Sequence, residues 1–421
     1  MNAVRICAVL LLTATTSTSA QSLGMLGTAP SEVEGQQFKF EDVVRNLRNP
    51  DPKTRLAAVR LLRDAKYPEA ITPIAPLVLD PMDDIQLEAI AAELGFFLDQ
   101  DVRTKKMIGF VVEKRTSGIA VAAFDLGPLA VWPRSVPQEL VSSLLQAIDD
   151  ENAAVRREAV YAFGVLARPP LTEDQQTRLV KALDHYDPAI RSATARVIAR
   201  SKFPDTGDAL IKAVNDSSAE VRFAAMRALG ATREARAAKA LTDQFAYYRK
   251  GEGAWAALDA LAHIGSPDTA PLFKERLQDK DPYIRRAAAE GVGRAGDASA
   301  ADALERMATT DESAMVRVAC AFALQKLGRN YAARIVDAMG NPKIVQQAQE
   351  YIVELGPPVT ATIAPRLQEP DAAVREAVAD VLGVIGDAST LPALEAAAKR
   401  TDASAAAAAK RAMARIQAPS R

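Results

Sequence analysis

A repeat of about 32 residues constrains this chain more than any other feature of its sequence. The segment AAVREAVADVLGVIGD at 372–387 recurs in related form at 153–167, 219–231, 282–297 and 314–328. Each copy can be aligned on its arginine, a position called the slot from here on. The slots run from Arg55 to Arg375 in ten steps, so the period averages 32 residues. Self-similarity at this period is typical of proteins in which each unit buries its apolar face against the next.

The columns of this register describe a helix. The position seven residues after the slot is apolar in all eleven copies: Leu62, Leu94, Leu126, Phe163, Ile198, Leu229, Leu261, Val292, Leu324, Ile352 and Leu382. The position three after the slot is mostly alanine, and both positions share one helical face. Asp, Asn or Ser usually stands four residues before the slot, where a side-chain oxygen caps a helix. Each period therefore contains a capped second helix, preceded by a first helix such as 140–148.

Composition supports an all-helical chain. Hydrophobic residues make up 49% of the 421 residues, but aromatic residues only 5%. Apolar mass carried by Ala, Leu, Val and Ile suits closely packed helices. We predict an all-α fold: one continuous right-handed α-solenoid of about twelve helix pairs over residues 38–417. Residues 103–136 fit this register as a diverged repeat followed by a long proline-rich loop.

An Asp or Asn cap, an arginine four residues later and a closing Leu-Gly resemble HEAT repeats, in particular the bacterial HEAT-like class named after phycobilisome lyase subunits. The resemblance covers roughly residues 40–417. It implies a ladder in which slot arginines and the preceding acids connect neighbouring repeats. The residues that match the ladder are Arg156, Asp187, Arg191, Arg222, Asp281, Arg285, Arg317, Asp371 and Arg375.

The N-terminus predicts export. Residues 1–20 have the form of a secretory signal peptide, with Arg5 before an apolar run and small residues before Gln21. Residues 21–37 are expected to be a flexible lead-in. No other apolar stretch approaches the length of a membrane span. We therefore expect an exported bacterial protein, periplasmic or secreted, whose mature form has one cysteine and no internal disulfide.

The sequence predicts no catalytic constellation, no cofactor and no metal site. His185 and His263 are far apart in the chain, and no HxxxH, HExxH or Cys cluster accompanies them. Cys320 occupies the small-residue column, which favours a packing role over a nucleophile or a bilin attachment site. The 52 basic and 53 acidic residues leave no basic field to hold nucleic acid.

Two regions are candidate contact surfaces. Positions one and five after the slot lie away from the packing seam, and there we single out Tyr161, Arg196, Phe223, Arg227 and Trp255. An ordinary solvated face of mixed charge is the alternative. The segment 246–253 replaces a capped turn and contains Tyr247, Tyr248 and Arg249. It reads either as a binding loop or as a diverged turn.

These observations predict an exported, non-catalytic scaffold that binds a protein or peptide through its concave helix face. Two other classes stay open. One is a lyase or chaperone-like subunit that handles a tetrapyrrole, which the resemblance to phycobilisome lyase repeats allows. The other is a self-associating structural component of the cell envelope.

Overall fold

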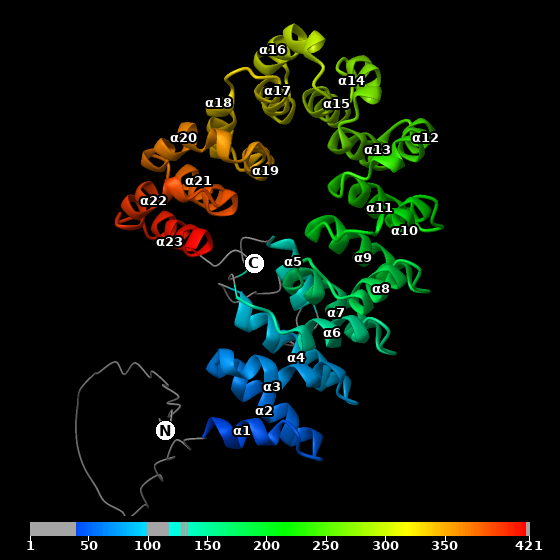
Figure 1. Cartoon of the computed structure of the whole chain (residues 1–421), viewed down its shortest axis with the longest axis vertical. Coiled ribbons are helices and arrows are strands. Elements are labelled where there is room, and N and C mark those ends of the chain that lie inside the picture. Colours follow the sequence, from blue (N-terminus) through cyan, green and yellow to red (C-terminus); the bar gives the residue numbers. More distant parts are fainter. Residues whose placement is uncertain (1–38, 99–117, 128–130, 132–133, 418–421) are drawn as a thin grey trace, which may run out of the picture.

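The computed structural model describes residues 39–98, 118–127, 131 and 134–417, and these residues are almost wholly helical. Helix pairs stack one on the next into a curved array (Figure 1). Within the described residues, β pairing is limited to an isolated antiparallel bridge between Leu98 and Val131. The predicted all-α solenoid is confirmed. The predicted signal peptide and lead-in, residues 1–37, lie outside the described residues.

The second helix of each pair starts at or just after a cap position. From α9 to α23 these second helices line the inner side of the curve, and the first helices lie outside (Figure 1). The second helices are α2 Pro52–Ala65, α4 Asp83–Phe97, α5 Ile119–Asp125, α7 Ala153–Leu166, α9 Pro188–Ser201, α11 Ala219–Ala231, α13 Gly251–Ile264, α15 Pro282–Ala295, α17 Ala314–Lys326, α19 Val345–Leu355, α21 Ala372–Ile385 and α23 Ala403–Gln417.

The first helices are shorter, and several begin or end in a 3-10 turn. They are α1 Phe40–Asn46, α3 Ile71–Ile74, α6 Gln138–Ala147, α8 Glu173–Ala182, α10 Gly207–Ala213, α12 Ala238–Tyr248, α14 Ala270–Arg276, α16 Ala301–Thr310, α18 Ala332–Asp337, α20 Thr360–Ile363 and α22 Leu391–Ala398. The diverged repeat keeps its expected second helix as α5, while its expected first helix falls in 99–117, outside the described residues.

Five of the predicted Asp and Asn caps form, whereas Asp83 is the first residue of α4 and α19 begins four residues after Asn341. Asp187 accepts from the backbone N–H of Ala189 at 2.9 Å, and Asn152 accepts from Ala154 at 2.8 Å. Asp51, Asp281 and Asp371 cap α2, α15 and α21 in the same way. Each bond satisfies an amide that the first helical turn leaves without a partner. In these five helices the start follows from the sequence.

The apolar column seven residues after the slot is buried, with one exception. Leu126 is 55% exposed, because α5 ends at Asp125 and leaves the leucine beyond the helix. The other ten members are fully buried. The next position, eight after the slot, is glycine in several repeats, and it permits a close backbone approach. A Cβ added to Gly293 would lie 2.5 Å from the Cα of Ala323 on the following second helix.

The column five residues after the slot differs from our expectation. We predicted that it would be displayed on the concave side, but several of its members are buried: Phe124, Tyr161, Glu290, Phe322 and Asp380. Long side chains from neighbouring repeats cover them. The ring of Tyr351, for example, stacks on Phe322 with centroids 4.3 Å apart.

Candidate functional site on the inner face

A ladder of arginines connects the repeats along the edge where the second helices begin. Arg191 donates from Nε and Nη2 to both carboxylate oxygens of Asp216 at 2.8 Å, and its Nη1 donates to backbone carbonyls of its own loop. Arg285 makes the same two-pronged contact with Asp311. Such bidentate, charge-assisted contacts fix geometry as well as adding energy.

The acids of this ladder are only partly those that the sequence indicated. Asp187 accepts from Arg156 at 3.1 Å, as the resemblance implies. In other repeats the acid stands six residues before the next slot, as Asp216 and Asp311 do, and not four. Asp371 caps α21, whereas its neighbour Arg375 reaches forward to Asp402. Arg317 donates to the carbonyls of Asp311 and Glu312.

In the irregular repeat around α12 and α13, aromatic side chains replace charged residues in the ladder. Arg222 donates from Nε to the hydroxyl of Tyr248 at 2.6 Å, where Arg191 and Arg285 donate to an acid. In place of a slot arginine, the indole Nε1 of Trp255 donates to Asp281 at 2.6 Å. Phe223 packs edge-on against Tyr248 with centroids 5.3 Å apart. Three of the predicted contact residues therefore hold neighbouring repeats together.

The remaining predicted contact residues divide by exposure. Tyr161 is buried, and its hydroxyl accepts from Arg196 Nη1 at 2.6 Å. The side chains of Arg196 and Arg227 stay 41% and 49% exposed, although each pairs with an acid. Tyr247 is 75% exposed and Arg249 is also exposed, so both project from the end of α12.

A second group of charged side chains gathers on the inner side of the array, where α13, α15 and α19 meet. We call it the inner-face cluster. Its members are Asp259, His263, Arg286, Glu290, Arg294, Tyr351 and Glu354. The spacing of the members on α13 and α15 is four residues, which places them on one face of each helix.

Glu290 lies at the centre of the inner-face cluster and is 1% exposed. Its Oε1 accepts from the hydroxyl of Tyr351 at 2.5 Å and lies 3.3 Å from Arg286 Nη1, while Oε2 lies 2.9 Å from Arg294 Nη1. Burial alone would raise the pKa of this carboxyl. The charges of Arg286 and Arg294 outweigh burial and lower the pKa to about 2. Glu290 is therefore ionised at neutral pH.

Glu354 joins α15 to α19 across the repeat between them. It accepts from Arg294 at 2.9 Å, and Arg233 at the end of α11 approaches it at 3.2 Å. Burial raises the pKa of Glu354, but the contact with Arg294 outweighs burial, so the net shift of the pKa is downward. A network that reaches from α11 to α19 requires tight curvature in this part of the solenoid.

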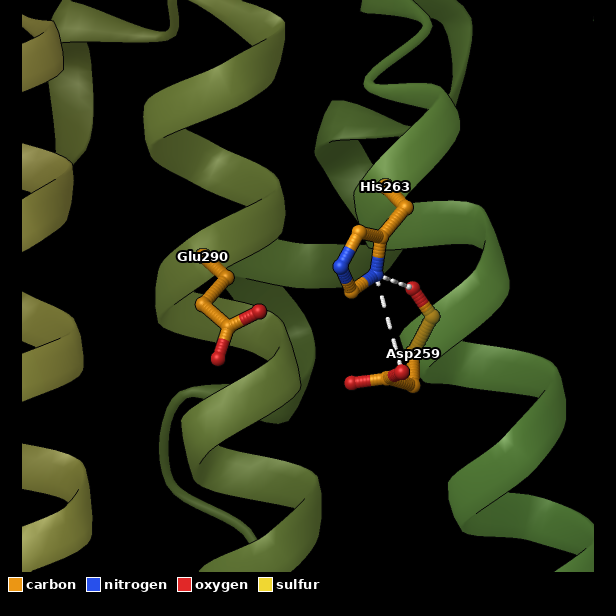
Figure 2. Close-up of side chains that lie close together, drawn as sticks. All are labelled: Asp259, His263 and Glu290. Atoms are coloured by element: carbon orange, nitrogen blue, oxygen red, sulfur yellow. Dashed lines mark hydrogen bonds and ion pairs between the residues drawn. The ribbon is translucent and has the colours of Figure 1, made fainter. Parts of the chain in front are cut away.

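His263 completes the inner-face cluster on its more exposed side. Its Nδ1 lies 2.9 Å from the backbone carbonyl oxygen of Asp259 and 3.5 Å from Oδ2 of the same residue. The other ring nitrogen, Nε2, faces Glu290 (Figure 2). One ligand atom each from Asp259, His263 and Glu290 lies within 4.8 Å of the other two. Among the residues that the structure describes, these three could hold a metal ion.

Sequence reasoning overlooked this cluster because it considered the two histidines as a pair. The structure brings one histidine together with carboxylates from its own helix and from the next repeat. The Asp259–His263 spacing of four residues on a helix was the available signal. The other histidine, His185, accepts from the backbone N–H of Asp187, two residues away.

Cys320 is completely buried in α17, and burial raises the pKa of its thiol to about 12. At neutral pH it is therefore protonated and enclosed, which does not suit a nucleophile or an attachment site. None of the described helices has the length and apolarity needed to cross a membrane.

Comparison with known proteins identifies the repeat type. The HEAT-repeat family model matches residues 177–249 and 249–325. Residues 177–325 are therefore similar to HEAT repeats. No curated protein sequence matches the chain.

Several solved structures match the chain at low similarity. An engineered protein is 18% identical, covering 90% of this chain and 98% of its own, with a TM-score of 0.31. The complex of CpcE and CpcF of phycocyanin lyase from Nostoc sp. is 18% identical, covering 75% and 99%, with a TM-score of 0.35. Importin beta is 13% identical, covering 89% and 56%, with a TM-score of 0.36. At these scores the similarities say nothing about what this chain binds.

Proposed function

We propose that this chain is an exported, non-catalytic HEAT-repeat scaffold, periplasmic or secreted, that binds an acidic segment of another protein along its inner face. The signal-like residues 1–20 support export. The solenoid form supports binding, because stacked repeats act through the extended surface they create.

The observation that carries this proposal is a row of exposed arginines on three consecutive second helices. Arg157 on α7, Arg196 on α9 and Arg227 on α11 have side chains that are 50%, 41% and 49% exposed. Asp125 and Glu252, the acidic partners of Arg196 and Arg227, are themselves more than half exposed, whereas Arg157 lies 4.0 Å from the buried Glu158. Exposed pairs contribute about 0–1 kcal/mol each, so a partner's carboxylate can replace the internal one at little cost.

The spacing of the row suits an extended peptide. Packed helices lie about 8–10 Å apart. An extended chain in the polyproline II form has three residues per turn and rises about 3.1 Å per residue, so every third side chain faces the same way at intervals of about 9 Å. An acidic side chain at every third residue of such a segment would therefore meet one arginine per repeat. Attraction of this kind acts mainly on the rate of association.

Binding can be tested with a synthetic extended peptide that carries glutamate at every third residue, and with a scrambled basic peptide as its counterpart. Arg196→Glu combined with Arg227→Glu should weaken binding of the acidic peptide at least tenfold, mostly by slower association. Lys239→Glu on the outer helix α12, where the lysine side chain is 86% exposed, is the matched control. Equal affinity of all variants for the acidic peptide would reject the inner face as the binding surface.

Export and the absence of catalysis need separate measurements. Cell fractionation with N-terminal sequencing should recover a mature chain that begins at Gln21; recovery of the uncleaved chain from the cytosol would reject export. A shift of the bilin's own visible absorption band on mixing with the purified protein would instead favour the tetrapyrrole-handling class.

A further inference from the structure

We propose that Asp259, His263 and Glu290 bind a divalent transition-metal ion of the Zn²⁺ type on the inner face of the solenoid. This site is independent of the proposed peptide surface, which lies on α7, α9 and α11. The metal would join α13 to α15, two adjacent second helices.

The positions of the three donors suit a metal site. Asp259 and His263 are four residues apart on α13 and therefore share one helical face. Glu290 comes from the same region of the next second helix. Their ligand atoms lie within 4.8 Å of one another. Ligands bound at about 2.0–2.2 Å to one Zn²⁺ ion must lie closer than that. The side chains of Asp259 and His263 are 22% and 36% exposed, and rotation of these two can close the gap.

The hydrogen bond of His263 prepares the ring to act as a ligand. Nδ1 lies 2.9 Å from the carbonyl oxygen of Asp259, a geometry that places the proton on Nδ1. The lone pair is then on Nε2, the nitrogen that faces Glu290 (Figure 2). Histidine ligands in proteins are held in this way, with the second nitrogen donating to a carbonyl or carboxylate.

The carboxylates around the site are already paired with cations. Asp259 and Glu290 contact Arg286, and Arg294 contacts both Glu290 and Glu354. Arg233 and Lys326 also contact Glu354, with side chains 58% and 31% exposed. A divalent ion must therefore compete with the arginines for the carboxylates of Asp259 and Glu290.

The arginines set how tightly the site can hold an ion. Arg286 lies 2.5 Å from Asp259 Oδ1, and Arg294 lies 2.9 Å from Glu290 Oε2. Both arginines repel a cation. Each carboxylate oxygen has two lone pairs, so contact with an arginine does not exhaust it. One imidazole with carboxylates favours Zn²⁺, Mn²⁺ or Fe²⁺ over Cu⁺, which prefers sulfur ligands.

The test uses the full mature chain, stripped of metal with EDTA and titrated with Zn²⁺ and then Mn²⁺ by calorimetry. One ion should bind per chain, and Co²⁺ should give a visible d–d absorption band. His263→Ala should weaken Zn²⁺ binding at least tenfold and abolish the Co²⁺ band. His185→Ala is the matched control and should bind as wild type. Circular dichroism verifies that each variant is folded.

Arg286→Gln is a second test, in which Zn²⁺ affinity should change in the opposite direction to that of His263→Ala. Removing this positive charge should tighten Zn²⁺ binding severalfold, provided the variant keeps its helicity. If neither Zn²⁺ nor Mn²⁺ binds the wild-type chain, or if His263→Ala binds them equally well, the site is only an ion-pair network. Peptide binding by α7–α11 is unaffected by that outcome, so the two proposals fail separately.

Discussion

Arg294 of α15 and Glu354 of α19 form an ion pair across an intervening repeat, with Nη2 2.9 Å from Oε2. In a gently curved solenoid each repeat contacts its immediate neighbours. Here the side chains of one second helix reach the second helix after next, and Tyr351 of α19 likewise donates to Glu290 of α15. The inner-face cluster therefore holds the array in a tight bend over α17.

Neutralising Glu354 should loosen this bend. Glu354→Gln preserves the shape of the side chain but removes the charge that Arg294, 5% exposed, depends on. We expect a loss of about 1–3 kcal/mol, because the arginine is left partly uncompensated. Hydrogen exchange is the suitable measurement, since repeat arrays need not unfold in one step, and protection should fall in α15 and α19. Asp243→Asn, in an exposed pair on α12, should change stability by less than about 0.5 kcal/mol. Equal protection of Glu354→Gln and wild type would show that the pair does not hold the bend.

Glu290 should make stability depend on pH at the acidic end. Its folded pKa of about 2 lies below the ordinary value of 4.5. A lowered carboxyl pKa stabilises the fold fully above the ordinary value, and the contribution disappears as pH falls towards the folded value. The stability difference between wild type and Glu290→Gln should thus be complete at neutral pH, roughly 2–4 kcal/mol. It should shrink between pH 4.5 and 2.

Chemical denaturation at a series of pH values measures this difference. Glu395→Gln, at an exposed position on α22, serves as the control and should follow wild type throughout. A difference for Glu290→Gln that stays constant down to pH 2 would mean that its effect is steric and not a matter of charge.

Two adjacent tyrosines distinguish a structural role from a binding role in the segment 246–253. Tyr248→Phe removes the hydroxyl that accepts from Arg222, and it should cost about 1 kcal/mol of stability. Tyr247→Phe should be neutral, since that side chain is 75% exposed. Thermal denaturation of both variants makes the comparison. If Tyr248→Phe is as stable as wild type, the hydrogen bond between Arg222 and Tyr248 does not help to hold the two repeats together.

Local features of the fold could be predicted from sequence because they depend on residues close in the chain. The caps at Asp187 and Asn152 and the buried column that includes Leu229 follow from helix periodicity and the chemistry of free amides. Leu126 was misplaced because α5 ends four residues earlier in the repeat than its neighbours α4 and α7. A period of 32 residues identifies which repeats are adjacent, but it does not set the curvature that accumulates over several of them.

The candidate site depends on that accumulated curvature. Contact between Glu290 and Tyr351 joins residues two repeats apart, and no spacing rule within one repeat predicts it. The ladder acids were predicted in part, since the sequence offered acids both four and six residues before the slot. Tyr248 and Trp255 were chosen as exposed aromatic residues. In the structure Tyr248 takes the place of a ladder acid and Trp255 the place of a slot arginine. Only their contacts with Arg222 and Asp281 reveal this.

The glycines eight residues after the slot should respond in opposite ways to the same substitution. Gly293→Ala would place a Cβ 2.5 Å from the Cα of Ala323, so α15 and α17 must move apart, at a cost of about 1–3 kcal/mol. Gly95 occupies the same register position in α4, but it has no heavy atom within 4 Å of an added Cβ. Gly95→Ala should therefore stabilise the protein by up to about 1 kcal/mol through the higher helix propensity of alanine. Thermal and chemical denaturation of the two variants decide the matter. Loss of stability in both, or in neither, would show that close approach of the second helices is not what requires glycine in this column.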